Sequence, residues 1–262
     1  MGLRRFAEKG NNVSKNNKVE SLYWDNEYKT FPRKKLKSQF WVGTRDYYNL
    51  LSRFIAPHHK VLDIGCAPGK TLAWAAKIRM AEVTGVDYSA NGIRISRWLF
   101  EQMKIDGVFL CEDIFQTTLP EATFDVVISS GFIEHFEDPA EIIDVHIKHV
   151  KPGGVVLITI PNYGGIYGSL QNFFNPDNLH LHNLNMMSID ALKKMALNNN
   201  YTKNIKAYTW GRTNPFLVHF SNKVNYKIAQ GFCLVWNCLG WLQPIHIPLL
   251  APMLVLEIHR LE

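Results

Sequence analysis

The chain has 262 residues, 47% hydrophobic and 20% charged, a composition that excludes disordered, collagen-like and coiled-coil proteins. Its length fits one large α/β domain with insertions better than two full domains. Residues 1–40 hold ten Lys/Arg against four Asp/Glu, so they carry the whole net charge of +6, and the neutral remainder predicts no nucleic-acid partner.

Signals for metals and membranes are weak. The four cysteines are irregularly spaced and form neither a disulfide framework nor a C-x2-C zinc pair, so we expect a reducing, cytoplasmic location. The first residues lack the apolar stretch of a secretory signal. The uncharged run 228–256 is interrupted by prolines and polar residues, so we expect no transmembrane span. It predicts a buried helix and a turn, with contact to a membrane surface or a second copy as the alternative.

The predicted elements alternate along the chain. Residues 1–39 are polar and basic and predict an irregular arm that could serve as a lid. The main domain is expected to span 40–262. Helical spacing predicts helices at 40–55, 68–77, 90–103 and 139–150. Short β-branched runs between them predict strands at 60–65, 82–87, 107–111, 124–129 and 155–160, with a turn at 151–154.

The last hundred residues are less regular. Residues 162–186 are rich in Gly, Asn, Phe and His and predict a loop-like cap insert after the fifth strand. A helix at 187–197 and strands at 201–210 and 252–259 complete the pattern. Continuous apolar strands between helices are typical of a parallel sheet covered on both faces. We therefore predict an α/β fold with a doubly wound, mostly parallel seven-stranded sheet, an N-terminal arm and the cap insert.

The candidate site follows from where these strands end, because ligands of open α/β sheets bind beyond the carboxyl ends of the strands. A turn from Gly65 to Gly69 follows the first strand and permits close approach to the backbone. Asp87 follows the second strand, where an acid accepts hydrogen bonds from ribose hydroxyls. Asp113 and Ile114 follow the third strand and offer a carboxylate for an exocyclic amine and an apolar wall for a purine.

Spacing separates three nucleotide ligands. A P-loop needs four residues between its glycines, but only three separate Gly65 from Gly69. A dinucleotide site needs G-x-G-x-x-G, and Ala67 occupies the place of the second glycine. The remaining interpretation is a ligand with ribose and adenine but no phosphates, and a NAD-dependent oxidoreductase stays an alternative.

At these motifs the chain resembles the class I S-adenosylmethionine-dependent methyltransferases, over roughly residues 40–162. The shared motifs are V-L-D-I-G-C-A-P-G at 61–69, G-V-D-Y-S at 85–89, E-D-I at 112–114, F-D-V-V-I-S-S at 124–130 and K-P-G-G at 151–154. The chain departs from the family pattern at Ala67, where glycine is common, and at Lys70. The resemblance implies a Rossmann-like fold, S-adenosyl-L-methionine as cofactor and S-adenosyl-L-homocysteine as product.

The same resemblance implies roles for individual residues. The implied cofactor-binding residues are Asp63, Gly65, Cys66, Ala67, Gly69, Asp87, Tyr88, Asp113, Ile114 and Ser130. The segment 131–136 resembles the Glu-His segment of small-molecule methyltransferases, including those of quinone biosynthesis, and the chain is also similar to sugar and natural-product methyltransferases. His135 is accordingly the candidate general base for a hydroxyl acceptor, with packing or helix capping as its structural alternative.

Substrate contacts are expected from the arm and the insert. Aromatic residues that precede the first strand are expected to fold over the cofactor: Tyr23, Trp24, Tyr28, Phe40 and Trp41. The candidate substrate-binding residues are Tyr23, Trp41, Tyr163, Tyr167, His180 and His182. On an extended segment His180 and His182 would share one side, as a metal pair does, but no third ligand is evident and no metal is predicted.

These observations predict a cytoplasmic enzyme that methylates a small molecule, most simply a hydroxyl of a sugar or another hydroxylated metabolite. N-methylation of a small amine is the alternative within the class. A protein that binds the cofactor without catalysis is the alternative from another class.

Overall fold

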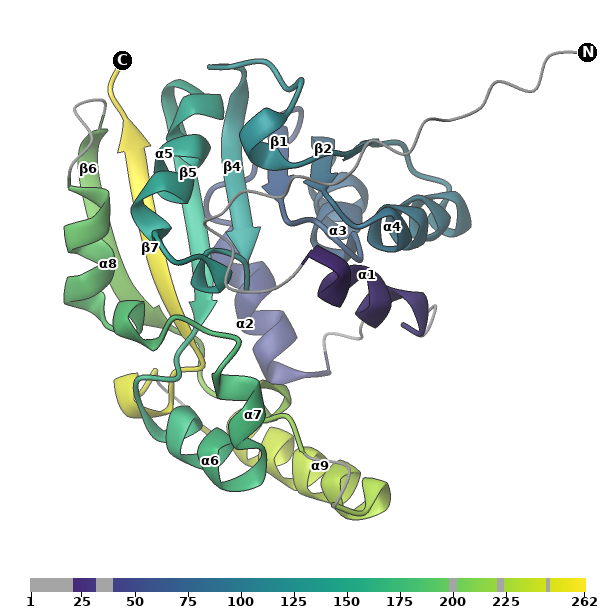
Figure 1. Cartoon of the computed structure of the whole chain (residues 1–262), viewed down its shortest axis with the longest axis vertical. Coiled ribbons are helices and arrows are strands. Elements are labelled where there is room, and N and C mark those ends of the chain that lie inside the picture. The colour runs from purple at the N-terminus through teal and green to yellow at the C-terminus, as the bar shows by residue number, and fades with distance from the viewer. Residues whose placement is uncertain (1–20, 32–39, 198–201, 221–223, 244–245) are drawn as a thin grey trace, which may run out of the picture.

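The computed structural model describes residues 21–31, 40–197, 202–220, 224–243 and 246–262. Its sheet has seven strands: β1 Lys60–Ile64, β2 Glu82–Asp87, β3 Val108–Cys111, β4 Phe124–Ser130, β5 Val150–Pro161, β6 Thr202–Trp210 and β7 Met253–Arg260. Their order is β3-β2-β1-β4-β5-β7-β6 (Figure 1). β1 to β5 are parallel, and β7 runs antiparallel to both β5 and β6. The predicted doubly wound, mostly parallel seven-stranded sheet is confirmed.

Helices cover both faces of this sheet and extend beyond one of its ends. They are α1 Ser21–Lys29, α2 Val42–Leu51, α3 Lys70–Arg79, α4 Ala90–Met103, α5 Pro139–His149, α6 Ile166–Phe174, α7 Pro176–Leu179, α8 Ile189–Ala196 and α9 Tyr226–Leu242. Apolar residues of α2, α3 and α4 pack in one core, and those of α5 and α8 pack in the core on the other face. Figure 1 places α6, α7 and α9 together beyond one end of the sheet.

The two cores explain why the strands read as continuous apolar runs. Successive side chains of a strand point to opposite faces. In β4, Val126 and Ile128 accordingly belong to one core, and Val127 between them belongs to the other. Both faces are covered, so both sets of positions are mostly apolar.

Helix starts lie where the sequence places capping residues. Ser89 accepts a hydrogen bond from the backbone N–H of Gly92 at the start of α4. Asp138 accepts one from Ala140 at the start of α5, whose first residue is Pro139. Such caps satisfy backbone donors that have no partner within the helix, which explains why these predicted boundaries lie close to the observed ones.

Residues 21–29 of the predicted irregular arm form α1, which packs on α4. The prediction missed this helix because its sequence has no apolar stripe. Its anchor is instead Asp25, whose carboxylate accepts hydrogen bonds from the Ser89 hydroxyl (2.8 Å) and the Asn91 backbone N–H (2.9 Å). Most of the rest of the arm lies outside the described residues.

Two local predictions in the second half of the chain were also wrong. The insert is not loop-like, because it folds into α6, α7 and the 3-10 turn Leu184–Met186. The predicted turn at 151–154 is part of β5, where Gly153 adopts φ +75° and a register shift opposite Phe124–Val126 absorbs the irregularity.

The predicted burial of the helix in 228–256 was wrong. The buried residues of α9 are Cys233, Asn237 and Gly240. Asn237 anchors the helix by accepting a hydrogen bond from the Val42 N–H (2.8 Å) and donating one to the Phe40 carbonyl (3.2 Å). Among the described residues, none of the helices combines the length and apolarity that crossing a bilayer requires.

Candidate active site

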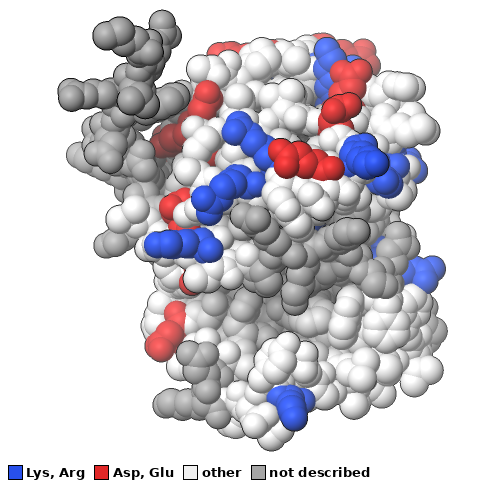
Figure 2. Space-filling view, turned by 90° about the vertical axis from the view of Figure 1, so that its right-hand side faces the viewer, with Lys and Arg blue, Asp and Glu red and all other residues white. Residues whose placement is uncertain are grey.

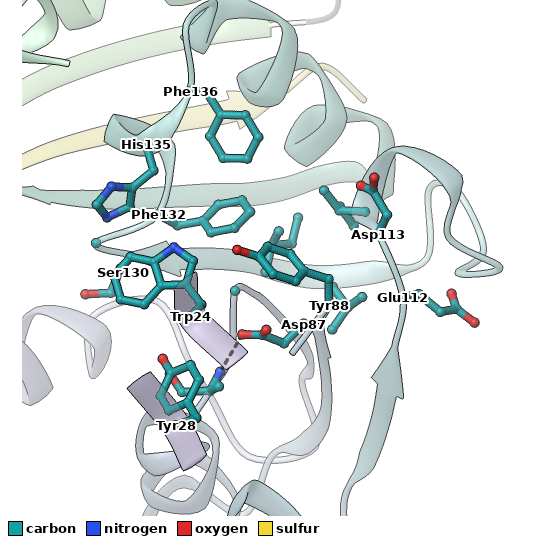
Figure 3. Close-up of a pocket in the computed structure, with 16 residues that line it drawn as sticks. Trp24, Tyr28, Asp87, Tyr88, Glu112, Asp113, Ser130, Phe132, His135 and Phe136 are labelled. Atoms are coloured by element: carbon teal, nitrogen blue, oxygen red, sulfur yellow. Dashed lines mark hydrogen bonds between the residues drawn. The ribbon is translucent and has the colours of Figure 1, made fainter. Parts of the chain in front are cut away.

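A pocket lies at the carboxyl ends of β1, β2 and β4, where the fold class predicts a ligand (Figure 3). The space between its lining atoms, open solvent at the mouth included, is about 710 Å³. Many sequence-predicted residues meet here: Gly65, Ala67, Asp87, Tyr88, Asp113, Ile114, Ser130 and His135. Figure 3 shows Asp113 and His135 at opposite sides of the pocket, with Asp87 and Tyr88 between them.

The turn after β1 forms the pocket floor. Gly65 has φ +72°, and a Cβ at this position would lie 2.4 Å from the ring of Phe132. Its N–H and that of Cys66 both donate to the carbonyl of Val86, which holds the turn against β2. Only glycine combines this backbone conformation with this close approach, so the turn lets a ligand reach the backbone.

Asp87 points into the centre of the pocket. Its two carboxylate oxygens accept hydrogen bonds from the backbone N–H groups of Ala67 (3.1 Å, dashed in Figure 3) and Ser89 (2.9 Å). Burial raises the pKa of Asp87 to about 6, although these two donors act in the opposite direction. A carboxylate offers about four acceptor positions, so the geometry leaves capacity for two ligand hydroxyls.

Asp113 provides the second acceptor of the pocket. Its Oδ1 accepts a hydrogen bond from the Phe115 N–H (3.0 Å), whereas its Oδ2 is buried and has no hydrogen-bond partner among the described residues. Buried polar atoms are rarely left in this state. The neighbouring Glu112 is held by the hydroxyls of Thr117 and Thr118 instead. Asp87 as an acceptor for ribose hydroxyls and Asp113 as an acceptor for an amine together match the polar groups of adenosine.

Helix α1 covers the pocket with two aromatic side chains. Tyr28 donates a hydrogen bond from its hydroxyl to the carbonyl of Ala67 (2.9 Å). Trp24 packs edge-on against His135, with ring centroids 5.0 Å apart. The other expected lid residues do not line this pocket: Tyr23 packs on Trp24, Phe40 packs on Trp41, and Trp41 packs on Phe216.

Three predicted cofactor-binding residues do not line the pocket. Asp63 is buried beneath it, and burial together with the charge of Asp87 raises its pKa well above the usual range. The Cys66 side chain packs against Gly85. Gly69 adopts φ +79° and caps the start of α3.

A second cavity adjoins the first and shares Trp24, Ser130, Gly131 and His135 with it. Most of its remaining walls come from α2, the start of α3, the end of β5, the insert and residues 214–219. The sequence candidates Tyr163 and His182 line this cavity, and Ser130 and His135 mark the junction of the two spaces.

Tyr167 and His180 line neither pocket. Tyr167 is buried in the insert, where its hydroxyl contacts Thr213 and donates to the Leu250 carbonyl. His180 is exposed. It directly follows α7, which ends at Leu179, and it keeps helical backbone angles. The segment is not extended as the shared-side argument assumed, so His180 and His182 do not form a pair.

His135 is oriented by the insert. Its Nδ1–H donates to the carbonyl of Leu181 (2.8 Å), so in the neutral ring Nε2 carries the lone pair. The buried residue Asn183 ties the same segments together, since its N–H donates to the Glu134 carbonyl (2.7 Å) and its side chain to the Phe136 carbonyl (3.1 Å). Residues 46 and 47 positions apart in sequence are thereby held in contact.

Glu134 is a buried acid to which the sequence analysis gave no role. Its side chain is 1% exposed, and burial raises its pKa to about 8. The titratable side chains that face it are His135, His182 and Tyr163. A sequence signal for Glu134 does exist: it is an acid that directly precedes the candidate base His135, shortly after the end of β4. Lys70 and His219, which also line the second cavity, carry no such signal.

Glu134→Gln is expected to stabilise the protein at high pH. A folded-state pKa raised to about 8 means that stability falls as pH rises from the unfolded value of 4.5 through 8, because the buried carboxylate must ionise. At pH 9 the variant should therefore exceed wild type by a few kcal/mol, on the order of 1.4 kcal/mol per pKa unit, and at pH 5 the two should agree. Thermal unfolding in EDTA at both pH values measures this. A difference that does not grow with pH would contradict the buried-carboxylate argument.

Fold and site together define a class. A sheet of this order with β7 antiparallel, an acid at the end of β2 and an unsatisfied carboxylate after β3 are the features of S-adenosylmethionine-dependent methyltransferases. Residues 33–205 match the model of the methyltransferase domain family, which is more than half of the chain, so the chain belongs to this family.

Two curated relatives illustrate the range of the family. The chain is 33% identical over 116 residues to phosphoethanolamine N-methyltransferase 3 of Arabidopsis thaliana, a match covering 44% of this chain and 23% of that protein. It is 34% identical over 106 residues to the ubiquinone biosynthesis O-methyltransferase of Psychrobacter arcticus, covering 39% of this chain and 41% of that protein. The chain thus spans less than half the length of either relative.

Solved structures support the same fold. Phosphoethanolamine N-methyltransferase 2 of Haemonchus contortus superposes with a TM-score of 0.60 at 18% identity, covering 83% of this chain and 53% of that chain. A SAM-dependent methyltransferase from Archaeoglobus fulgidus gives a TM-score of 0.56 at 19% identity, covering 91% and 98%. At these identities the likeness concerns the fold alone.

Proposed function

We propose that this protein transfers a methyl group from S-adenosyl-L-methionine to a hydroxyl of a small molecule, such as a sugar or another hydroxylated metabolite. The observation that carries the proposal is the position of His135. It borders both cavities, and the Leu181 carbonyl holds its ring so that the basic nitrogen is Nε2. A base at this junction suits an acceptor that must lose a proton.

S-adenosyl-L-methionine supplies a methyl group bound to a positively charged sulfur. Within the pocket, Asp87 would bind the ribose hydroxyls and Asp113 the adenine amino group. Trp24 and Tyr28 would cover the bound cofactor and exclude water. Methyl transfer is an in-line displacement, so holding the reactants in line supplies much of the rate, about 7–11 kcal/mol in favourable cases.

The second cavity suits a polar acceptor. It presents the hydroxyls of Tyr47 and Thr71 together with Tyr163 and His182. Burial raises the pKa of both tyrosines, so they stay protonated. The Tyr163 hydroxyl donates to the Leu217 carbonyl (2.8 Å), so its oxygen can accept a hydrogen bond from a hydroxyl of the acceptor. Such a lining supports a hydroxylated metabolite.

N-methylation of a small amine is the second candidate. The buried Glu134 in the same cavity favours it, because a carboxylate there would bind an ammonium group. The N-methyltransferase relative adds support by analogy alone.

Calorimetry followed by an acceptor screen tests the proposal. Titration with S-adenosylhomocysteine should give micromolar binding, about 8 kcal/mol, with NAD and ATP as controls that do not bind. Transfer of labelled methyl groups to a hydroxylated panel, but not to an amine panel, would support O-methylation. The reverse preference favours the amine, and binding without any transfer favours a non-catalytic cofactor-binding protein. If the protein binds NAD in preference to S-adenosylhomocysteine, the proposed methyl transfer is contradicted.

We also propose that α9 rests on a membrane surface. Its exposed apolar side chains are Tyr226, Ile228, Phe232, Leu234, Val235, Leu239, Trp241 and Leu242. The helix carries one charged residue, Lys227, and aromatic residues stand near both ends, as in helices at lipid interfaces. Figure 2 shows few charged side chains over the lower part of the molecule.

Sedimentation with anionic phospholipid vesicles tests this contact. Wild type should co-sediment, and Val235→Asp with Leu239→Asp should not. The matched control is Ile78→Asp, since Ile78 is an exposed apolar residue on α3. Dimerisation in light scattering without vesicle binding would instead assign the face to a second copy.

The cytoplasmic location stays a prediction. All four cysteines are free thiols, which supports a reducing compartment. Fractionation of the producing cells would test it.

A further inference from the structure

Three metal-binding side chains converge where the two cavities meet. One ligand atom each of Glu134, His135 and His182 lies within 4.8 Å of the others. The two imidazole rings are 4.9 Å apart between centroids. No third ligand is evident near His182 in the sequence, because Glu134 and His135 belong to the distant 3-10 turn Ile133–His135, which only the fold brings close.

Both histidines are oriented as metal ligands usually are. His135 donates its Nδ1–H to the Leu181 carbonyl (2.8 Å), and His182 donates its Nδ1–H to the Asn178 carbonyl (2.9 Å). In metal sites the second ring nitrogen commonly makes such a bond, which fixes the tautomer and the ring orientation. Each ring therefore carries its lone pair on Nε2, the nitrogen that can coordinate an ion.

The carboxylate of Glu134 independently points to a missing partner. Its Oε2 is buried and has no hydrogen-bond partner among the described residues. A buried acid oxygen without a partner is costly, and the two imidazoles near it are not hydrogen-bonded to that atom. A cation between the three groups would satisfy it.

We propose that Glu134, His135 and His182 form a binding site for one divalent transition-metal ion. Two imidazole nitrogens and one carboxylate suit Zn²⁺, Co²⁺ or Fe²⁺, whereas Mg²⁺ and Ca²⁺ prefer oxygen ligands. Bonds of about 2.0–2.2 Å place tetrahedral ligands about 3.4 Å apart. The ligand atoms lie within 4.8 Å of one another, so binding requires them to close by up to about 1.4 Å. Catalytic zinc sites that use two histidines and one glutamate keep a fourth coordination position open for water or substrate.

The site gives the proposed function a second way to activate a hydroxyl acceptor, and this consequence rests on that function. An acceptor oxygen that enters from the second cavity would occupy the open position, where the ion lowers its pKa. The O–H bond breaks and the proton passes to water in the cavity. The oxygen lone pair then forms the bond to the methyl carbon as the carbon–sulfur bond breaks. Because ion and proton compete for Nε2 of His135, this residue acts as base only in the metal-free protein.

Cobalt provides a probe that does not depend on activity. Titration of the apoprotein with Co²⁺, followed by visible absorption and calorimetry, should show one ion per chain at micromolar affinity. Glu134→Gln and His182→Asn should each weaken binding at least 100-fold. The matched control is His180→Ala, which removes an exposed imidazole two positions from His182 and should bind Co²⁺ like wild type.

Each variant is also titrated with S-adenosylhomocysteine, which separates the two proposals and reports folding. Two outcomes overturn the metal site alone, provided that S-adenosylhomocysteine still binds. In the first, wild type does not bind Co²⁺. In the second, Glu134→Gln and His182→Asn bind Co²⁺ as tightly as wild type. If wild type does not bind S-adenosylhomocysteine, the proposed function is overturned, but the Co²⁺ result still stands. An equal loss of Co²⁺ in His180→Ala would assign the ion to the surface and also overturn the site.

Discussion

Asp87→Ala is expected to weaken binding of S-adenosylhomocysteine at least 100-fold. The carboxylate lies in the middle of the pocket, and its two backbone donors hold it there while acceptor positions remain for two ribose hydroxyls. Hydrogen bonds to a charged group contribute about 1.5–3 kcal/mol each, so the loss of two supports this magnitude. Isothermal titration of the purified variant measures it.

The control for this variant is Asp106→Ala, which removes an exposed acid away from the pocket and should bind like wild type. Circular dichroism of Asp87→Ala excludes unfolding as the cause. An affinity within a factor of three of wild type would show that Asp87 does not hold the ligand.

The pH dependence of the same titration checks the ionised form. Because the pKa of Asp87 is raised to about 6, the carboxylate is ionised at pH 7.5 and protonated near pH 5. A protonated carboxyl has fewer acceptor positions, so affinity of the wild type should fall as pH falls through 6. Asp87→Ala should bind weakly at both pH values, without this slope.

His135→Asn is expected to lower the rate constant of methyl transfer by about 10²- to 10⁴-fold, the usual contribution of a general base. Asparagine keeps a donor near the position of Nδ1, so the hydrogen bond to Leu181 can survive while Nε2 is lost. Cofactor affinity should change less than threefold, because Asp87 and Asp113 are untouched. Single-turnover transfer to the acceptor found in the screen measures the rate.

The pH profile distinguishes a reacting histidine from a packing one. In wild type measured with EDTA, the rate should rise with pH as the imidazole loses its proton, and His135→Asn should lack this rise. His180→Asn, on an exposed site, should keep both rate and profile. A full rate in His135→Asn would assign His135 to packing against Trp24.

The lining of the first pocket was largely predictable from sequence. Strand and helix periods locate the sheet, and the fold class places all parallel strand ends at one edge. Gly65, Asp87 and Asp113 are the residues at those ends, so their meeting in one pocket needs no knowledge of side-chain packing. Asp63 at the end of β1 and Cys66 in the turn after it are buried and do not line the pocket, a distinction that local sequence does not contain.

The second cavity was decided by tertiary structure. The sequence by itself determined the sheet, its strand ends and the acids placed there, because these depend on residues within one element. Helix α1 over the pocket, the second cavity and the approach of Glu134 and His135 to His182 depend on contacts between distant segments, among them the bonds of Asp25 to Asn91 and of Asn183 to Phe136. The hydrophobic periodicity of the sequence does not predict such contacts, because each joins residues that are far apart in the chain and meet only in the folded structure.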